Sequence, residues 1–146
     1  MMFKLLKDFT PPHGYKIGLY LRSATGDQSQ VEKQEIKLKA FVLEQNLHFN
    51  FGRIEKVFVD APGSGTDPER PSFQVLLKSA SDREIDLILV SDLPRLSRSL
   101  STVVDILRLC YFGGCNLISL RENFHFLEDY AIEDFILREF LSDRRP

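Results

Sequence analysis

The sequence predicts an α/β protein with a doubly wound, mainly parallel sheet, helices on both of its faces and a C-terminal helix. Apolar segments with strand character alternate with amphipathic helical segments in the order βαβαβαβα, and the connections between them are short. The segment 85–90 is apolar at nearly every position, which is typical of a central strand buried on both faces. A length of 146 residues indicates one domain.

Each element follows from its local pattern. Residues 1–15 form a lead-in containing the stiff Pro11-Pro12 pair, and the domain spans residues 16–146. The first strand begins at Lys16, where apolar positions alternate, and later strands are expected at residues 54–60, 85–90 and 116–120. Helices are expected at residues 30–46, 72–81, 100–112 and 130–142, with Ser72 as a cap and Gly113-Gly114 as a stop.

Arginines recur in the loops that follow the first three strands. Arg22 follows the first strand, Arg70 follows the second, and the pair Arg95 and Arg98 follows the third. Ligands of doubly wound sheets bind outside the carboxyl ends of the strands, and guanidinium groups suit phosphate and carboxylate. The pattern therefore favours an anion site at this edge. An alternative is that the arginines form ordinary surface ion pairs with nearby carboxylates, namely Asp27, Asp60, Asp67 and Glu69.

Composition limits the function classes. The net charge of −2 excludes a polycation, so nucleic-acid binding requires a local basic patch or another domain. No apolar run approaches the length of a membrane span, and the N-terminus is too short and polar for a signal peptide, so a cytoplasmic protein is expected. Cys110 and Cys115 are expected to be reduced thiols. Histidines in three different elements, His13, His48 and His125, indicate neither a catalytic triad nor a metal site.

Four segments together resemble the catalytic domain of the serine recombinase family, which comprises resolvases and invertases. YLRSATGDQ, at residues 20–28, resembles the family's tyrosine-x-arginine-x-serine-threonine opening. VFVDAPGSGTDPERPSFQVLL, at residues 57–77, resembles its strand, SGT and arginine-proline segment. SDLPRLSRSL, at residues 91–100, resembles its aspartate-arginine-leucine-x-arginine loop. SLRENF, at residues 119–124, resembles the strand and turn before the family's long last helix.

The resemblance implies the catalytic domain of a site-specific recombinase, which cuts and rejoins DNA through a phosphoserine intermediate. In this family arginines stabilise the transition state with no metal or other cofactor, and they fall on Arg22, Arg70, Arg95 and Arg98. Gln28 matches a polar residue that helps to hold the loop, and Tyr20 matches a tyrosine that is expected to pack in the core. The glycines of the second loop are expected to let Arg70 lie outside the cluster when no DNA is bound.

The resemblance also implies DNA and further copies of the chain as partners, and no membrane. A homodimer or tetramer is expected through the last helix, which carries an apolar stripe of Ile132, Phe135, Ile136 and Phe140. The family's C-terminal DNA-binding domain is expected to be absent from this chain.

Two departures from the family's pattern concern the chemistry. The nucleophilic serine falls on Ala24, which has no hydroxyl group, so the chain as given is expected to be inactive. The aspartate before the paired arginines falls on Pro94, which has no carboxylate. Ser23 is a candidate substitute nucleophile, but on an extended segment its side chain points away from that of Arg22. Thr25 has a similar directional problem.

Two alternatives to an active recombinase stay open. The first is a non-catalytic relative that binds DNA or assembles with an active partner. The second is a generic anion-binding α/β domain, which the arginine pattern alone also fits. A phosphorylation receiver domain shares the fold class but needs an acidic cluster after the first strand, where this chain has Arg22.

Overall fold

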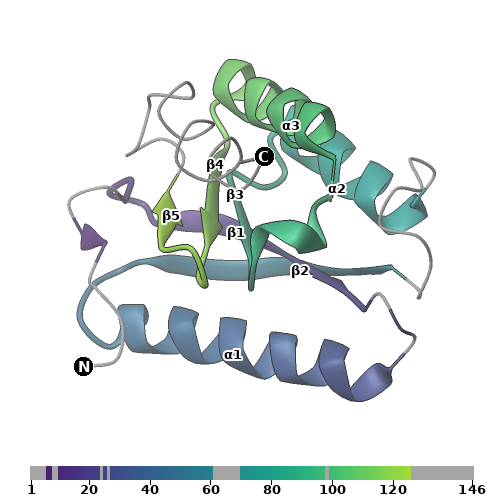
Figure 1. Cartoon of the computed structure of the whole chain (residues 1–146). Coiled ribbons are helices and arrows are strands. Elements are labelled where there is room, and N and C mark those ends of the chain that lie inside the picture. The colour runs from purple at the N-terminus through teal and green to yellow at the C-terminus, as the bar shows by residue number, and fades with distance from the viewer. Residues whose placement is uncertain are drawn as a thin grey trace, which may run out of the picture.

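The computed structural model describes residues 6–7, 10–23, 25, 27–60, 70–97 and 99–125. Its elements are β1 (Tyr15–Arg22), α1 (Gln28–Asn46), β2 (Gly52–Asp60), α2 (Pro71–Ser81), β3 (Leu87–Val90), the short 3-10 helix η2 (Leu93–Arg95), α3 (Leu100–Gly113), β4 (Asn116–Ser119) and β5 (Phe124–His125). The strands and the α-helices are labelled in Figure 1. The helix expected at residues 130–142 lies outside the described residues. Within the described ranges, no helix is long and apolar enough to cross a membrane.

The strands form one sheet in the order β2-β1-β3-β4-β5. Strands β1 to β4 are parallel, which confirms the predicted fold, and β3 is the central strand, as its apolar sequence indicates. β5 is an addition that the sequence pattern does not predict, and it pairs antiparallel with β4. Two residues are too few to produce a recognisable alternation of apolar and polar positions.

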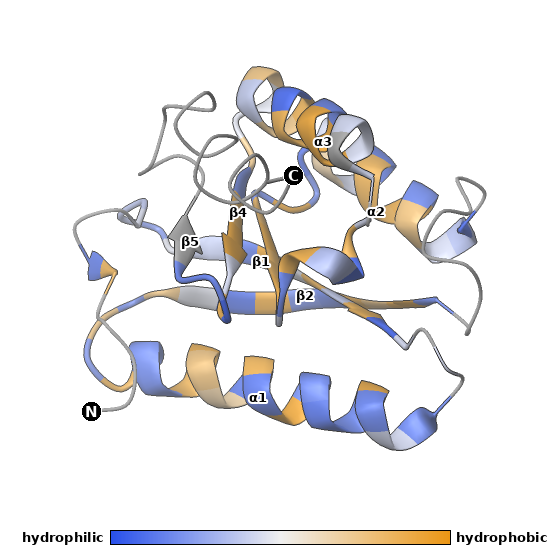
Figure 2. Cartoon of the chain, in the orientation of Figure 1, coloured by the Kyte–Doolittle hydropathy of each residue, from blue (hydrophilic) through white to orange (hydrophobic). Residues whose placement is uncertain are grey.

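Helices cover both faces of the sheet, as expected for a doubly wound fold. Figure 1 shows α1 on one face and α2 with α3 on the other. The side chains of β1 divide between the two: Tyr20 packs with residues of α2 and α3, whereas Leu19 and Leu21 pack with residues of α1. Figure 2 shows that the central strands are largely hydrophobic, which is the composition expected of strands buried on both faces. Cys110 and Cys115 are buried free thiols, and a hydrogen bond with Cys110 together with burial raises the pKa of Cys115.

The helix termini differ in part from the sequence-based expectation. α1 begins at Gln28, two residues earlier than expected, because the Asp27 side chain caps it by accepting from the N–H of Ser29. The expected cap at Ser72 is wrong, because α2 begins at Pro71, whose fixed φ and missing N–H suit the first helical position. α3 ends at Gly113 and, as expected, is capped by glycine: Gly114 has a left-handed φ of 70°.

Gly52, at the start of β2, lies against the backbone of β1. A Cβ atom at this position would lie 2.4 Å from the carbonyl oxygen of Tyr15 and 2.8 Å from its nitrogen, and the φ of Gly52 is +154°. We therefore expect Gly52→Ala to lower the free energy of unfolding by about 2–3 kcal/mol, measured by urea denaturation. Gly113→Ala is the matched control, because a Cβ there meets nothing within 4 Å, and it is expected to be neutral. Equal stability of the two variants would contradict this prediction.

Candidate active site

The direction of winding reverses between β1 and β3, because β2 lies on one side of β1 and β3 lies on the other. In doubly wound sheets the crevice at the carboxyl ends of such a strand pair is the usual ligand site. Arg22 is the last residue of β1, and residues 91–96, which contain η2, follow β3. Residues 91–96 are called the 91–96 turn. Because β3 lies beside β1, this turn, which contains Arg95, lies beside the end of β1.

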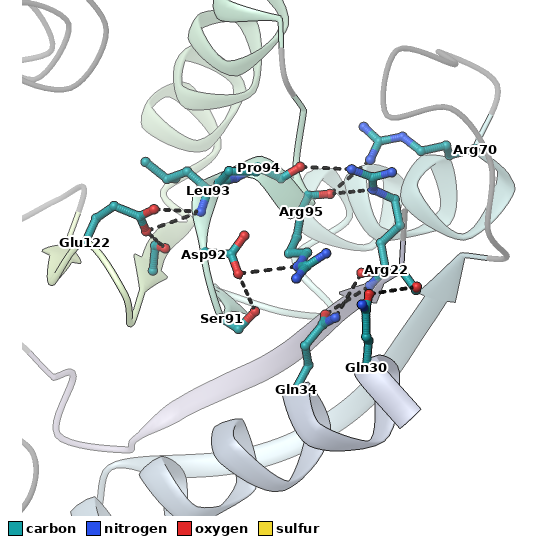
Figure 3. A network of polar contacts seen from close by, with 12 residues as sticks. Arg22, Gln30, Gln34, Arg70, Ser91, Asp92, Leu93, Pro94, Arg95 and Glu122 are labelled. Carbon is teal, nitrogen blue, oxygen red and sulfur yellow. Dashed lines mark hydrogen bonds and ion pairs between the residues drawn. The ribbon is translucent and has the colours of Figure 1, made fainter. Parts of the chain in front are cut away.

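Arg22 and Arg70 both bind the backbone of the 91–96 turn (Figure 3). Arg22 donates from Nε to the carbonyl oxygen of Arg95 at 3.2 Å and from Nη2 to that of Pro94 at 2.9 Å. Arg70 donates from Nη1 to the same Arg95 oxygen at 3.0 Å and from Nη2 to the carbonyl oxygen of Leu96. Arg22 is 1% exposed and Arg70 is 6% exposed. Two buried guanidinium groups from different loops therefore hold one turn.

A buried hydroxyl and a buried carboxylate connect Arg70 to β1 and β2. The Tyr20 hydroxyl donates to Oδ2 of Asp60 at 2.5 Å and accepts from Nη1 of Arg70 at 3.1 Å. Asp60 also accepts from the N–H groups of Ser72 and Phe73, at 2.9 and 3.1 Å, and so caps α2. Burial raises the pKa of Tyr20 well above its usual value, the bond to Asp60 raises it further, and the charge of Arg70 opposes the shift. Tyr20 is therefore a neutral, structural link, as its expected packing role indicates.

The Arg95 side chain pairs with a carboxylate of its own turn. Its Nε lies 3.3 Å from Oδ2 of Asp92, three residues earlier, and that oxygen also accepts from Oγ of Ser91 at 3.1 Å. The distance is that of an ion pair, but the N–H is not aligned for a hydrogen bond with Asp92. Although Pro94 lacks the carboxylate of the expected pattern, Asp92 brings a carboxylate to Arg95.

Two glutamines of α1 hold the end of β1. Gln34, which is buried, accepts from the backbone N–H of Arg22 at 3.2 Å and donates to its carbonyl oxygen at 2.9 Å. Gln30 accepts from the Ser23 hydroxyl at 3.0 Å, and Ser23 is 1% exposed. The Ser23 side chain therefore points toward α1. The Arg22 guanidinium lies instead at the 91–96 turn (Figure 3). The two side chains therefore point in opposite directions, as strand alternation predicts.

Glu122, in the turn between β4 and β5, holds the start of η2. Its carboxylate oxygens lie 3.2 and 3.3 Å from the backbone nitrogen of Leu93, from which they accept, and one of them also accepts from the Ser119 hydroxyl. The N–H of the first residue of a helix has no partner within that helix, so a carboxylate there satisfies it and interacts favourably with the helix dipole. Glu122 thus also holds the 91–96 turn, from the segment that follows β4.

Among the described residues, the structure brings together three of the predicted site residues. Arg22, Arg70 and Arg95 meet at the 91–96 turn, so Arg70 lies within the cluster and not outside it as expected, because carbonyl oxygens of the turn accept from both of its Nη groups. Gln28 is exposed at the start of α1, and among the described residues Gln30 and Gln34 hold the end of β1. Thr25 is exposed, with its hydroxyl 3.4 Å from that of Ser23. Two further predicted residues, Ala24 and Arg98, lie outside the described residues.

Four carboxylates were considered as ion-pair partners of the arginines, and the two that the structure describes cap helices instead. Asp27 caps α1 and Asp60 caps α2. The other two, Asp67 and Glu69, lie outside the described residues.

The sequence-based prediction misses several residues of this site, and two of them leave a signal in the sequence. Gln34 occupies a buried position in the apolar stripe of α1, where a polar side chain requires a partner. Asp92 precedes Arg95 by three residues, a spacing at which side chains on a helical turn are neighbours. Glu122 leaves no signal, because its contact with Leu93 depends on how β4 and β3 pair.

A comparison with known families decides the identity of the chain. The family described as "Resolvase, N terminal domain" matches residues 17–141. The chain belongs to the resolvase family of serine recombinases. No curated protein matches the chain.

Solved structures of resolvase-family proteins share this fold. The N-terminal catalytic domain of TP901-1 integrase matches with a TM-score of 0.70 and 24% identity, over 88% of this chain and 97% of that one. A resolvase family site-specific recombinase from Streptococcus pneumoniae gives 0.65 and 23%, over 88% and 91%. A serine recombinase from Sulfolobus solfataricus gives 0.59 and 23%, over 84% and 78%. At these identities the likeness is one of fold.

The arginine arrangement of this resolvase-family domain suits an anion. Among the described residues, no group of three or more metal-binding side chains occurs. Guanidinium groups are fixed, permanently charged donors that match the geometry of phosphate oxygens. The carboxyl edge of the sheet in this resolvase-family domain therefore carries preorganised positive charge.

Proposed function

We propose that this chain is the catalytic domain of a site-specific recombinase in which the arginine crevice holds a DNA phosphodiester. The observation that carries the proposal is the convergence of Arg22, Arg70 and Arg95 on one turn at the reversal point of the sheet. Arg98 is assigned to the same group by its place in the sequence motif. DNA is therefore the proposed partner, and a cytoplasmic location is part of the proposal.

The chemistry proposed for this crevice is transfer of a DNA phosphoryl group to a serine hydroxyl. The serine oxygen bonds to phosphorus, the bond to the 3′ oxygen of the DNA breaks, and that oxygen leaves with a proton as a 3′-hydroxyl. Negative charge on the non-bridging oxygens is stabilised by fixed guanidinium groups. Position 24 is the proposed site of the nucleophile, and Ala24 leaves the chain as given without it.

A second candidate function is DNA binding or assembly without cleavage. The observation that favours it is again Ala24, which has no attacking atom. Buried Ser23 offers little as a replacement, because its hydroxyl donates to Gln30 on the α1 side. If the chain is a recombinase that lacks only its nucleophile, a hydroxyl at position 24 restores DNA cleavage. If it is a binding or assembly module, the same hydroxyl restores nothing.

The experiment that separates the two candidates compares DNA binding and covalent capture on the same substrate. The parent chain is expected to bind DNA with an affinity that falls steeply as salt rises, because phosphate contacts release counterions. The Ala24→Ser variant, with a DNA-binding module fused after Pro146, is expected to add a covalent adduct with a nicked substrate. Binding that does not respond to salt argues for neither candidate and would leave only a generic anion-binding domain.

Self-association through the last helix is also part of the proposal. The apolar stripe over residues 130–142 is more typical of a helix that packs against another chain than of a helix exposed to solvent. We expect sedimentation equilibrium of the chain to detect a dimer and Phe135→Glu to shift it toward monomer, because a charge in an apolar contact is costly. Sedimentation of the parent chain as a monomer alone at high concentration would count against this interface.

A further inference from the structure

Arg95 differs from Arg22 and Arg70 in what its guanidinium contacts. Arg22 and Arg70 donate to carbonyl oxygens of the 91–96 turn and are almost fully buried. Among the described residues, the Arg95 side chain contacts Asp92 through Nε, and its Nη groups bind no described atom. The Arg95 side chain retains 23% exposure although its Nε is buried. The guanidinium edge that carries the Nη groups is therefore the one available to a ligand.

We propose that Asp92 is a positioning residue, which holds Arg95 by its Nε edge so that both Nη groups face a phosphate in the crevice. This inference rests on the proposed function of the crevice and assigns different roles to its arginines. Arg22 and Arg70 hold the backbone of the 91–96 turn, and Arg95 is the arginine of the described part that binds the phosphate.

The local geometry supports a positioning role for Asp92. Asp92 is the residue immediately before η2 and Arg95 is the last residue of η2, so the short turn brings their side chains to within 3.3 Å of each other. The Asp92 side chain is 13% exposed and is itself held by the Ser91 hydroxyl. The backbone beneath the pair is fixed by the two buried arginines, and Glu122 holds its first N–H.

The Asp92–Arg95 pair lies at ion-pair distance without an aligned hydrogen bond, so it can tighten when a phosphate binds. Contacts of a catalytic site are often long or poorly aligned without ligand and shorten when the ligand binds. A phosphate on the Nη edge would compete for neither the Nε–H nor Asp92, so both anions can hold one guanidinium at once. Positioning in this way leaves less side-chain freedom to be lost on binding.

A competing role for Asp92 predicts the opposite result. If Asp92 were only a counter-ion that occupies Arg95, removing its charge would strengthen the binding of any anion. If Asp92 positions Arg95, removing its charge weakens phosphate binding even though the protein becomes more positive. The sign of the change therefore distinguishes the two roles.

The test titrates the 146-residue chain with inorganic phosphate and follows the Nε–Hε NMR signal of each arginine. Asp92→Asn is compared with Asp105→Asn, a matched control that makes the same charge change in an exposed pair with the same spacing, Asp105–Arg108. Asp92→Asn is expected to weaken phosphate binding threefold to tenfold, roughly the effect of freeing one long side chain, while Asp105→Asn changes it less than twofold. Asp92→Glu is expected to recover part of the loss, and nuclear relaxation should show Arg95 Nε rigid in the parent chain and mobile in Asp92→Asn.

Each outcome decides one part of the proposal. Tighter phosphate binding by Asp92→Asn than by Asp105→Asn would make Asp92 a counter-ion and overturn the inference. Equal binding, with Arg95 Nε equally rigid, would overturn it as well. If phosphate shifts no arginine signal in the parent chain, the proposed anion site fails, whereas a mobile Arg95 in Asp92→Asn alone would still establish that Asp92 orients it.

Discussion

Replacing Ala24 by serine is expected to give this chain a covalent DNA adduct where the parent chain forms none. The crevice already holds Arg22, Arg70 and Arg95 at the carboxyl edge of the sheet, and the proposed chemistry lacks only the attacking hydroxyl. The adduct is measured as a slowly migrating protein–DNA band on a denaturing gel, with a nicked duplex that prevents religation. A DNA-binding module of known site, fused after Pro146, holds the chain on this substrate.

Arg95→Ala in the Ala24→Ser background is the control for the role of the crevice. Loss of one preorganised charge at a transition state usually costs on the order of a hundredfold in rate, and we expect at least this loss in the rate of adduct formation. Arg108→Ala, which removes an exposed arginine of α3, is expected to leave the rate within about twofold.

Two results would contradict the assignment of position 24. An adduct formed by the parent chain and lost in Ser23→Ala would make Ser23 the nucleophile, which requires its hydroxyl to leave Gln30 and turn away from α1. Absence of an adduct from Ala24→Ser, with the chain held on its substrate, would favour the function of DNA binding without cleavage.

Asp60→Ala is expected to lower the free energy of unfolding by about 4 kcal/mol. The carboxylate is 3% exposed and accepts from the Tyr20 hydroxyl and from the N–H groups of Ser72 and Phe73. Each buried donor left without an acceptor costs about 1–3 kcal/mol, and the N-terminus of α2 loses its cap as well. Urea denaturation followed by circular dichroism measures the change.

Two matched variants separate the roles of the Asp60 carboxylate. Asp60→Asn keeps one acceptor oxygen at nearly the same volume, so it is expected to cost about half as much as the alanine change. Asp105→Ala removes an exposed carboxylate from α3 and is expected to change stability by less than about 0.5 kcal/mol. A loss below about 1 kcal/mol in Asp60→Ala would show that water replaces the carboxylate, contrary to the burial of this site.

The amino-acid sequence by itself determined the fold class and the edge of the sheet at which the arginines gather. The alternation of strand and helix segments requires parallel strands with crossover helices, and the apolar run at residues 85–90 requires a central position, which β3 has. Loops that follow parallel strands must then share one edge, so the convergence of Arg22, Arg70 and Arg95 follows from the order of the elements. Strand alternation likewise determined that Ser23 points away from Arg22.

Only the tertiary structure decided what each of these side chains binds. Arg22 reaches the carbonyl oxygen of Arg95 across 73 positions of sequence, and this contact exists only because β3 lies beside β1. The roles of Asp60 as a cap for α2 and of Glu122 as a partner of Leu93 depend in the same way on which elements are neighbours. Local sequence limits the backbone of each segment, but hydrogen-bond partners are chosen by distances of about 3 Å between segments, and those distances are set only when the layers pack.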